Sequence, residues 1–96
     1  MHTEIKGVHL NVTDQIRDYI EKKYQKLDYA KDLIIDLLTT LTKEKNSFKI
    51  ESNINFRWGA SAHISTDSFD IYEGIDTLID KLETKVRREK DKIKEH

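Results

Sequence analysis

The stretch FKIESNINFRW, residues 48–58, decides the fold because apolar and polar residues alternate along it. In an extended chain, successive side chains point to opposite faces, so an alternating pattern gives one apolar and one polar face. The residues expected on the apolar face are Phe48, Ile50, Ile54, Phe56 and Trp58. The pattern therefore predicts a strand with one face in the core and the other in solvent.

The neighbouring segments predict two more strands. Gly59 can supply a turn, after which Ala60, Ala62 and Ile64 alternate with polar residues, as in an antiparallel hairpin. The earlier run LIIDLLTTLT, residues 33–42, is short and rich in β-branched residues, which favours a largely buried strand. Its expected buried side consists of Leu33, Ile35, Leu37 and Leu41.

The amino-terminal residues predict a further strand, in which alternation begins at Thr3 and Ile5 and breaks near Gly7. The pattern is expected to resume at three apolar positions: Val8, Leu10 and Val12.

Two helices are expected. Thr13 can cap a helix of about residues 14–27, whose apolar residues recur at helical spacing. Asp70 and Glu73 form a capping-box pattern at the start of a second helix, which runs to about Ile93. The apolar side of the second helix comprises Ile71, Ile75, Leu78, Ile79, Leu82, Val86 and Ile93.

The resulting order is β-α-β-β-β-α. A sheet with one polar face requires both helices to cover the other face, so we expect a two-layer α+β fold with a four-stranded mixed sheet. The first two strands should pair in parallel and the hairpins antiparallel. Ninety-six residues suffice for one core, so residues 1–96 are expected to form a single domain.

Composition excludes several classes of function. The chain has no cysteine, and its four histidines are scattered without metal-site spacing, so we expect neither a metal nor a cofactor. Asp76 with Asp80, or His63 between Ser61 and Ser65, offers no convincing catalytic set, and we expect no enzyme. No signal peptide or membrane span is recognisable, which favours a cytoplasmic protein.

Positive charge is concentrated at the carboxyl end. Residues 81–96 carry seven basic and four acidic side chains, although the formal net charge of the whole chain is −1. Four of these cations are expected to form one row along the second helix, with no acid in the row: Lys81, Lys85, Arg88 and Lys92. A shorter basic group, Arg87, Lys90 and Lys94, should lie among the acids Asp76, Asp80 and Glu83 across the helix.

The first helix adds three cations: Lys22, Lys23 and Lys26. Because both helices should cover the same sheet face, their lysines are expected to converge on a basic groove that contacts RNA phosphates. From the residues alone, three alternatives stay open. The basic row can be an ordinary solvated helix face, or it can be a generic RNA-binding surface. The third alternative is a protein-interaction module that uses the polar sheet face.

Three motifs mark the two helices and the end of the chain: IRDYIEKKYQKLD (residues 16–28), DIYEGIDTLIDKL (70–82) and KDKIKEH (90–96). On these motifs, and over essentially its whole length, the chain resembles the ribosome hibernation promoting factor family, which includes the ribosome-associated inhibitor A proteins. It implies a fold like that of double-stranded RNA-binding domains. The chain shows neither the long linker and dimerising domain nor the acidic tail of other members, as expected of the short form.

The resemblance also implies a function and site residues. Family members occupy the decoding channel of the small ribosomal subunit, block messenger and transfer RNA, and in the short form promote inactive ribosome pairs with a separate modulation factor. The chain is accordingly expected to bind rRNA and to be a monomer off the ribosome. Basic positions shared with the family are Arg17, Lys23, Lys26, Lys81, Arg88, Lys90 and Lys92, and Lys43 coincides with a strand-end lysine of some members. Lys85 and Arg87 replace polar residues, and Gly74 replaces an alanine, either loosening the helix or admitting closer backbone approach.

Overall fold

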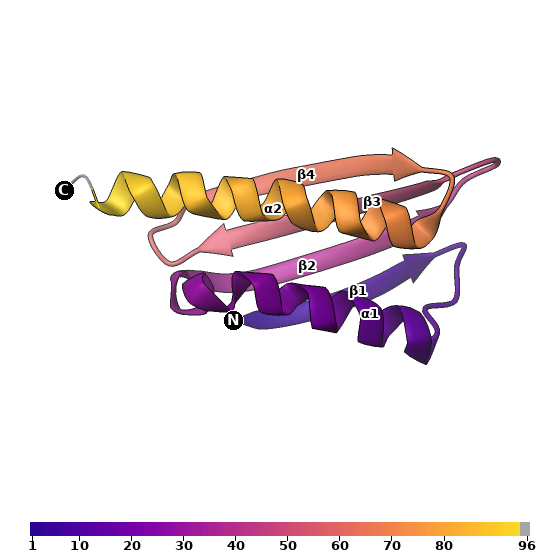
Figure 1. Ribbon diagram of the computed structural model, residues 1–96, viewed down its shortest axis with the longest axis horizontal. Coiled ribbons are helices and arrows are strands. Elements are labelled where there is room, and N and C mark those ends of the chain that lie inside the picture. The colour runs from indigo at the N-terminus through magenta and orange to yellow at the C-terminus, as the bar shows by residue number, and fades with distance from the viewer. Residues whose placement is uncertain (95–96) are drawn as a thin grey trace.

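The computed structural model describes residues 1–94, with the backbone only at residue 94. Its elements follow the predicted order, with a 3₁₀ segment, η1, added after the first helix (Figure 1). They are β1 (His2–Val8), α1 (Asp14–Tyr24), η1 (Gln25–Leu33), β2 (Ile34–Lys43), β3 (Phe48–Phe56), β4 (Ser61–Ser68) and α2 (Ile71–Lys94).

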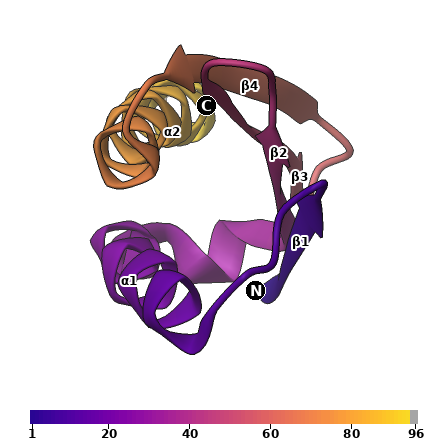
Figure 2. The same ribbon diagram turned by 90° about the vertical axis from the view of Figure 1, so that its right-hand side faces the viewer.

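The sheet has the predicted mixed topology. Its strand order is β1-β2-β3-β4, with β1 parallel to β2 and the other neighbours antiparallel. Both helices lie on the same side of the curved sheet, with α1 near β1 and α2 over β4 (Figure 2). The two-layer α+β architecture is therefore confirmed.

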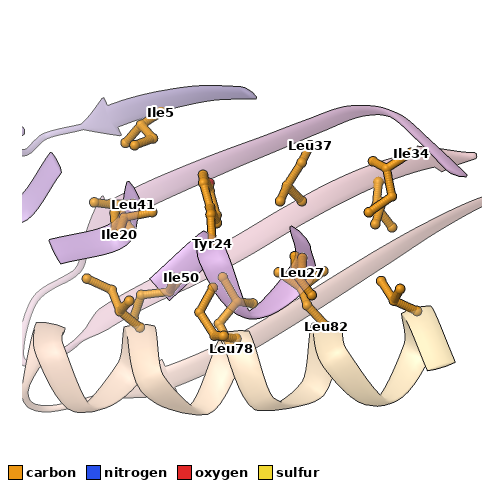
Figure 3. Packing of buried hydrophobic residues seen from close by; sticks show 14 of the residues in the cluster. Ile5, Ile20, Tyr24, Leu27, Ile34, Leu37, Leu41, Ile50, Leu78 and Leu82 are labelled. Atoms are coloured by element: carbon orange, nitrogen blue, oxygen red, sulfur yellow. The ribbon is translucent and has the colours of Figure 1, made fainter. Parts of the chain in front are cut away.

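The core lies between the sheet and the helices, where Ile20, Tyr24 and Leu27 approach the sheet opposite Leu78 and Leu82 of α2 (Figure 3). Polar groups inside it are satisfied. The Tyr24 hydroxyl contacts Thr39 Oγ1, which lies 2.7 Å from Ser52 Oγ. Burial, partly offset by the bond to Thr39, raises the pKa of Tyr24 to about 12.

The side chains of β2 differ from the prediction at its start. Ile34 is buried, whereas Ile35, expected in the core, is 49% exposed. The pairing of β2 with β3 shifts register between Ile34 and Asp36. Such an irregularity inserts one extra residue into a strand, so the alternation of buried and exposed side chains is reversed before it. The predicted alternation is therefore correct from Leu37 onward and wrong at Ile35.

The predicted strand break near Gly7 is wrong. β1 runs through Gly7 and ends at Val8, and the next residue, His9, has a positive φ of 55°. A Cβ at Gly7 would lie 2.2 Å from the Leu10 carbonyl oxygen, so the chain must turn back closely here and needs a glycine. Leu10 and Val12 consequently pack on the core from a loop, not from a strand.

The ends of two other elements also differ from expectation. α1 gives way to η1 after Tyr24, so Leu27 reaches the core from a 3₁₀ segment. Trp58 lies beyond the end of β3, and Ile93 lies near the end of α2. Both are partly exposed and not in the core, at 41% and 40%.

α2 begins as predicted, with the Asp70 carboxylate accepting hydrogen bonds from the backbone N–H groups of Tyr72 and Glu73. The structure also decides between the alternatives for Gly74. A Cβ there would lie 2.4 Å from Ile50 Cδ1 and 3.0 Å from Ser68 Cβ. Glycine therefore admits a close approach of α2 to the sheet.

Candidate nucleic-acid interface

α2 carries its charges on two sides of its buried stripe. Lys81 Nζ donates a hydrogen bond of 3.2 Å to the Ser65 carbonyl on β4, which places this side of the helix beside the sheet edge. Asp76 and Asp80, across the helix, instead contact cations of α1 and η1. The stripe in between is held against the sheet by Leu78, Leu82 and other buried residues.

The predicted row along α2 exists as a cationic surface. We call Lys81, Lys85, Arg88 and Lys92 the cationic row. Its first three members line a shallow hollow of about 320 Å³ together with Ile64 and Thr84. Among residues 1–93, no carboxylate lies within ion-pair distance of Arg88. Its guanidinium is thus free to bind an anion.

The prediction that this surface is free of acids is wrong, because Glu89 lies inside it. Glu89 is only 5% exposed, and its Oε1 lies 3.2 Å from both Lys85 Nζ and Lys92 Nζ. Burial by itself would raise the pKa of Glu89, but the hydrogen bonds and charges of Lys92 and Lys85 outweigh it and hold the pKa below its ordinary value. Glu89 is therefore ionised at neutral pH and offsets one charge of the row.

The other side of α2 forms a polar contact with α1. Lys23 Nζ lies 3.3 Å from Asp76 Oδ1, and Lys26 Nζ lies 3.9 Å from Asp80 Oδ1. The Tyr19 hydroxyl donates a 2.7 Å hydrogen bond to the same Asp76 oxygen. This bond, with a smaller contribution from burial and from the negative charge of Asp76, raises the pKa of Tyr19 to about 12.

These contacts overturn the predicted convergence of the two lysine sets. The cationic row faces the β4 edge, whereas Lys23 and Lys26 face the acids on the opposite side of α2. Lys22 and Lys23 of α1 and Lys26 of η1 line a hollow of about 430 Å³ with Tyr19 and Gln25, although Lys23 and Lys26 also contact Asp76 and Asp80. The protein therefore has two separate basic surfaces.

The remaining predicted cations are dispersed. Arg87 Nη2 lies 2.7 Å from Glu83 Oε1, and Lys90 Nζ lies 5.0 Å from the centre of the Tyr29 ring. Lys43, at the end of β2, lies over Phe48 at 4.5 Å. Arg17 is exposed on α1. The side chain of Lys94 lies outside the described residues, as do residues 95 and 96.

The open face of the sheet carries mutually paired charges. Glu51 lies 3.8 Å from Lys49 Nζ and 3.6 Å from His63 Nε2, while His63 Nδ1 is 2.8 Å from Asn53 Oδ1. Pairing of this kind leaves little net charge with which to attract a polyanion. This face is consequently a weaker candidate than the helices for binding RNA.

The sequence prediction did not recognise the surface character of Trp58. Its ring stacks on Phe56, with centroids 5.0 Å apart, and lines a hollow with Glu89, Lys92 and Ile93. The alternating pattern predicted Trp58 to be in the core, although Gly59 directly after it marks the turn at which that pattern ends.

Along residues 1–94, no helix combines the length and apolar character required to cross a membrane.

Comparison with known proteins gives a consistent result. Residues 3–94 match the model of a family described as sigma 54 modulation protein / S30EA ribosomal protein. The chain is 33% identical to the ribosome hibernation promoting factor of Klebsiella oxytoca, with full coverage of both chains. It is 36% identical to that of Azotobacter vinelandii over 92 residues, covering 96% of this chain and 85% of the relative.

Two solved structures share the fold. A ribosomal subunit interface protein from Coxiella burnetii superposes with a TM-score of 0.87 at 24% identity, covering 95% of this chain and 99% of its own. The N-terminal domain of Protein Y from Thermus thermophilus gives a TM-score of 0.81 at 31% identity, with coverage of 92% and 98%. The Protein Y domain is therefore similar to this chain in sequence as well as in fold.

Proposed function

The chain belongs to the sigma 54 modulation protein / S30EA ribosomal protein family, and on that premise we propose that it is a ribosome hibernation factor. As a single ribosome-binding domain, it would bind rRNA in the decoding channel of the small ribosomal subunit in the cytoplasm. Occupation of that channel would exclude messenger and transfer RNA and stop translation without any chemical step. The inactive ribosomes would then pair, with a separate modulation factor assisting.

The observation that carries this proposal is the cationic row. Four long cations project from one side of α2, and Arg88 has no carboxylate partner among residues 1–93. Phosphate contacts supply most of the affinity in nucleic-acid interfaces that do not depend on sequence. A second basic surface, formed by Lys22 and Lys23 of α1 and Lys26 of η1, offers further phosphate contacts, fewer than its three charges suggest because Lys23 and Lys26 contact Asp76 and Asp80.

The distribution of acids also supports selective binding. Asp76, Asp80 and Glu83 occupy the opposite side of α2 from the row, so the positive field is confined to limited surfaces on a chain of net charge −1. A confined field steers a protein toward one partner surface, whereas a uniformly basic protein binds any polyanion.

Sedimentation with ribosomes tests the proposal. The protein is mixed with separated small and large subunits at moderate salt and centrifuged through sucrose, and a reporter message is translated in parallel. We expect co-sedimentation with the small subunit and loss of translation at near-equimolar protein. Equal affinity for free duplex RNA and for small subunits would instead identify a generic RNA-binding protein.

A further inference from the structure

A hollow of about 420 Å³ lies between the β3–β4 turn and the last turns of α2. Trp58 lines it from the turn, and Glu89, Lys92 and Ile93 line it from the helix. The Trp58 ring lies nearly parallel to that of buried Phe56, at an interplanar angle of 19°. Trp58 is thus supported by the core while 41% of it stays exposed.

The cationic row leads to this hollow. At a rise of 1.5 Å per residue, Lys81 to Lys92 extends about 16 Å along α2, enough for two or three phosphates of a nucleic-acid strand. Lys92 is both the last member of the row and part of the wall of the hollow. A strand that follows the row therefore arrives beside Trp58.

We propose that Trp58 stacks against an unpaired base of an RNA strand whose phosphates lie along the cationic row. Ile93, which is 40% exposed in the same hollow, would contact the base from the helix side. Aromatic rings bind bases of single strands in this way because every base has a flat π face. The inference rests on the proposed function and adds a base contact to an interface otherwise driven by charge.

Trp58 is the only tryptophan of the chain, so its fluorescence reports directly on stacking. The intact protein is titrated at low salt with a six-nucleotide single-stranded RNA, and with the same oligomer made without bases. The complete oligomer should quench the fluorescence, and the abasic one should not. Because Trp58→Leu has no tryptophan, affinities of the variants are compared by the fluorescence anisotropy of an end-labelled oligomer. Trp58→Leu should bind the complete oligomer about tenfold more weakly, as expected for the loss of one stacked base.

Matched variants separate stacking from other effects. Trp58→Phe should keep most of the affinity because it keeps an aromatic ring. Phe69→Leu should keep all of the affinity, since Phe69 is an 84% exposed aromatic residue near the other end of α2. The slope of log affinity against log salt should be the same for Trp58→Leu and the unmodified protein, since no phosphate contact is removed.

The failures of the two proposals are distinguishable. Absence of quenching by the complete oligomer, or equal affinities of Trp58→Leu and the unmodified protein for it, would overturn the stacking site even if the protein still co-sediments with small subunits. Failure of the unmodified protein to co-sediment would overturn the proposed function, whatever the oligomer does.

Discussion

Lys23 Nζ in α1 lies 3.3 Å from Asp76 Oδ1 in α2, so this side of α2 faces the first helix and the cationic row faces away from it. The same carboxylate accepts the hydrogen bond from Tyr19. The space between the helices is consequently bridged by paired charges. The unpaired positive charge of α2 lies at the β4 edge, where Lys81 and Arg88 line the hollow beside Ile64.

Replacing both Asp76 and Asp80 by asparagine tests this division. The Asp76 and Asp80 side chains are 46% and 72% exposed, and ion pairs of such exposure typically contribute less than about 1 kcal/mol each. We expect a small loss of unfolding free energy in urea titrations, and a change in small-subunit affinity smaller than that produced by changing the row. A large gain in affinity would indicate that the RNA lies between the helices.

Replacing Glu89 by glutamine should strengthen binding. Glu89 offsets the charges of Lys85 and Lys92, which both lie 3.2 Å from its Oε1. Glutamine removes this negative charge and raises the net charge of the row by one. The slope of log affinity for the small subunit against log salt should therefore steepen by up to about one. Binding measured between low and moderate salt checks this. Unchanged affinity and slope would place the RNA away from this end of α2.

The stability of the Glu89→Gln variant provides the accompanying control. Because the folded protein lowers the pKa of Glu89, the carboxylate stabilises the fold above the pKa of the unfolded chain, near 4.3, and this contribution is lost as pH falls through the folded value. The variant should therefore lose less stability than the unmodified protein on acidification. Its far-ultraviolet circular dichroism at pH 7 should match that of the unmodified protein.

The sequence predicted the order of elements well because long alternating and helical patterns determine which face is buried. It failed at Ile35, where a register shift reverses the alternation, and at Trp58, where the strand had already ended. The position of the cationic row on α2 was predictable from 3.6-residue spacing. The side to which it turns was not, because that depends on where α1 packs. Glu89 was predictable, since it lies four residues after Lys85.

Gly74→Ala should destabilise the fold despite the better helix propensity of alanine. Alanine gains about 1 kcal/mol in a helix, but its Cβ would lie 2.4 Å from Ile50 Cδ1 in a packed core, and overpacking costs about 1–3 kcal/mol. Ile50→Val removes that Cδ1 atom. In a double-mutant cycle followed by urea unfolding, the two changes together should cost less than the sum of the single changes. Strictly additive costs would show that the clash with Ile50 does not cause the destabilisation by Gly74→Ala.

Tyr24 should make stability fall at alkaline pH. Its pKa is raised from about 10 in the unfolded chain to about 12 in the fold, so the contribution of neutral Tyr24 to the free energy of unfolding is complete below pH 10. This contribution is lost as pH rises from 10 to 12, by up to about 3 kcal/mol. Tyr24→Phe should reduce this loss, while Thr39 keeps its bond to Ser52. Urea unfolding at pH 8 and pH 11 measures the difference. An equal alkaline loss in Tyr24→Phe and in the unmodified protein would contradict this prediction.

Arg88 should contribute more than Lys85 to the salt dependence of ribosome binding. Each phosphate contact contributes roughly 0.7–0.9 to the log–log slope, so Arg88→Gln should flatten it by about that amount. Lys85→Gln should flatten it less, because Lys85 is already paired with Glu89. Arg88 is exposed and has no carboxylate partner among residues 1–93, so its replacement should not affect folding. Lys85→Gln removes one of the two cations that contact buried Glu89, so it should also lower the free energy of unfolding.

Two cations outside the row provide the matched controls for Arg88. Lys49 lies on the open sheet face 3.8 Å from Glu51, and Arg87 lies on α2 itself 2.7 Å from Glu83. Each loses one positive charge on replacement by glutamine, as Arg88 does, so the effect of net charge alone is the same in all three variants. A larger change in slope for Arg88→Gln than for either control would locate the phosphates on the row. A larger change for Lys49→Gln would move the RNA to the open face of the sheet and leave the row as a solvated helix surface.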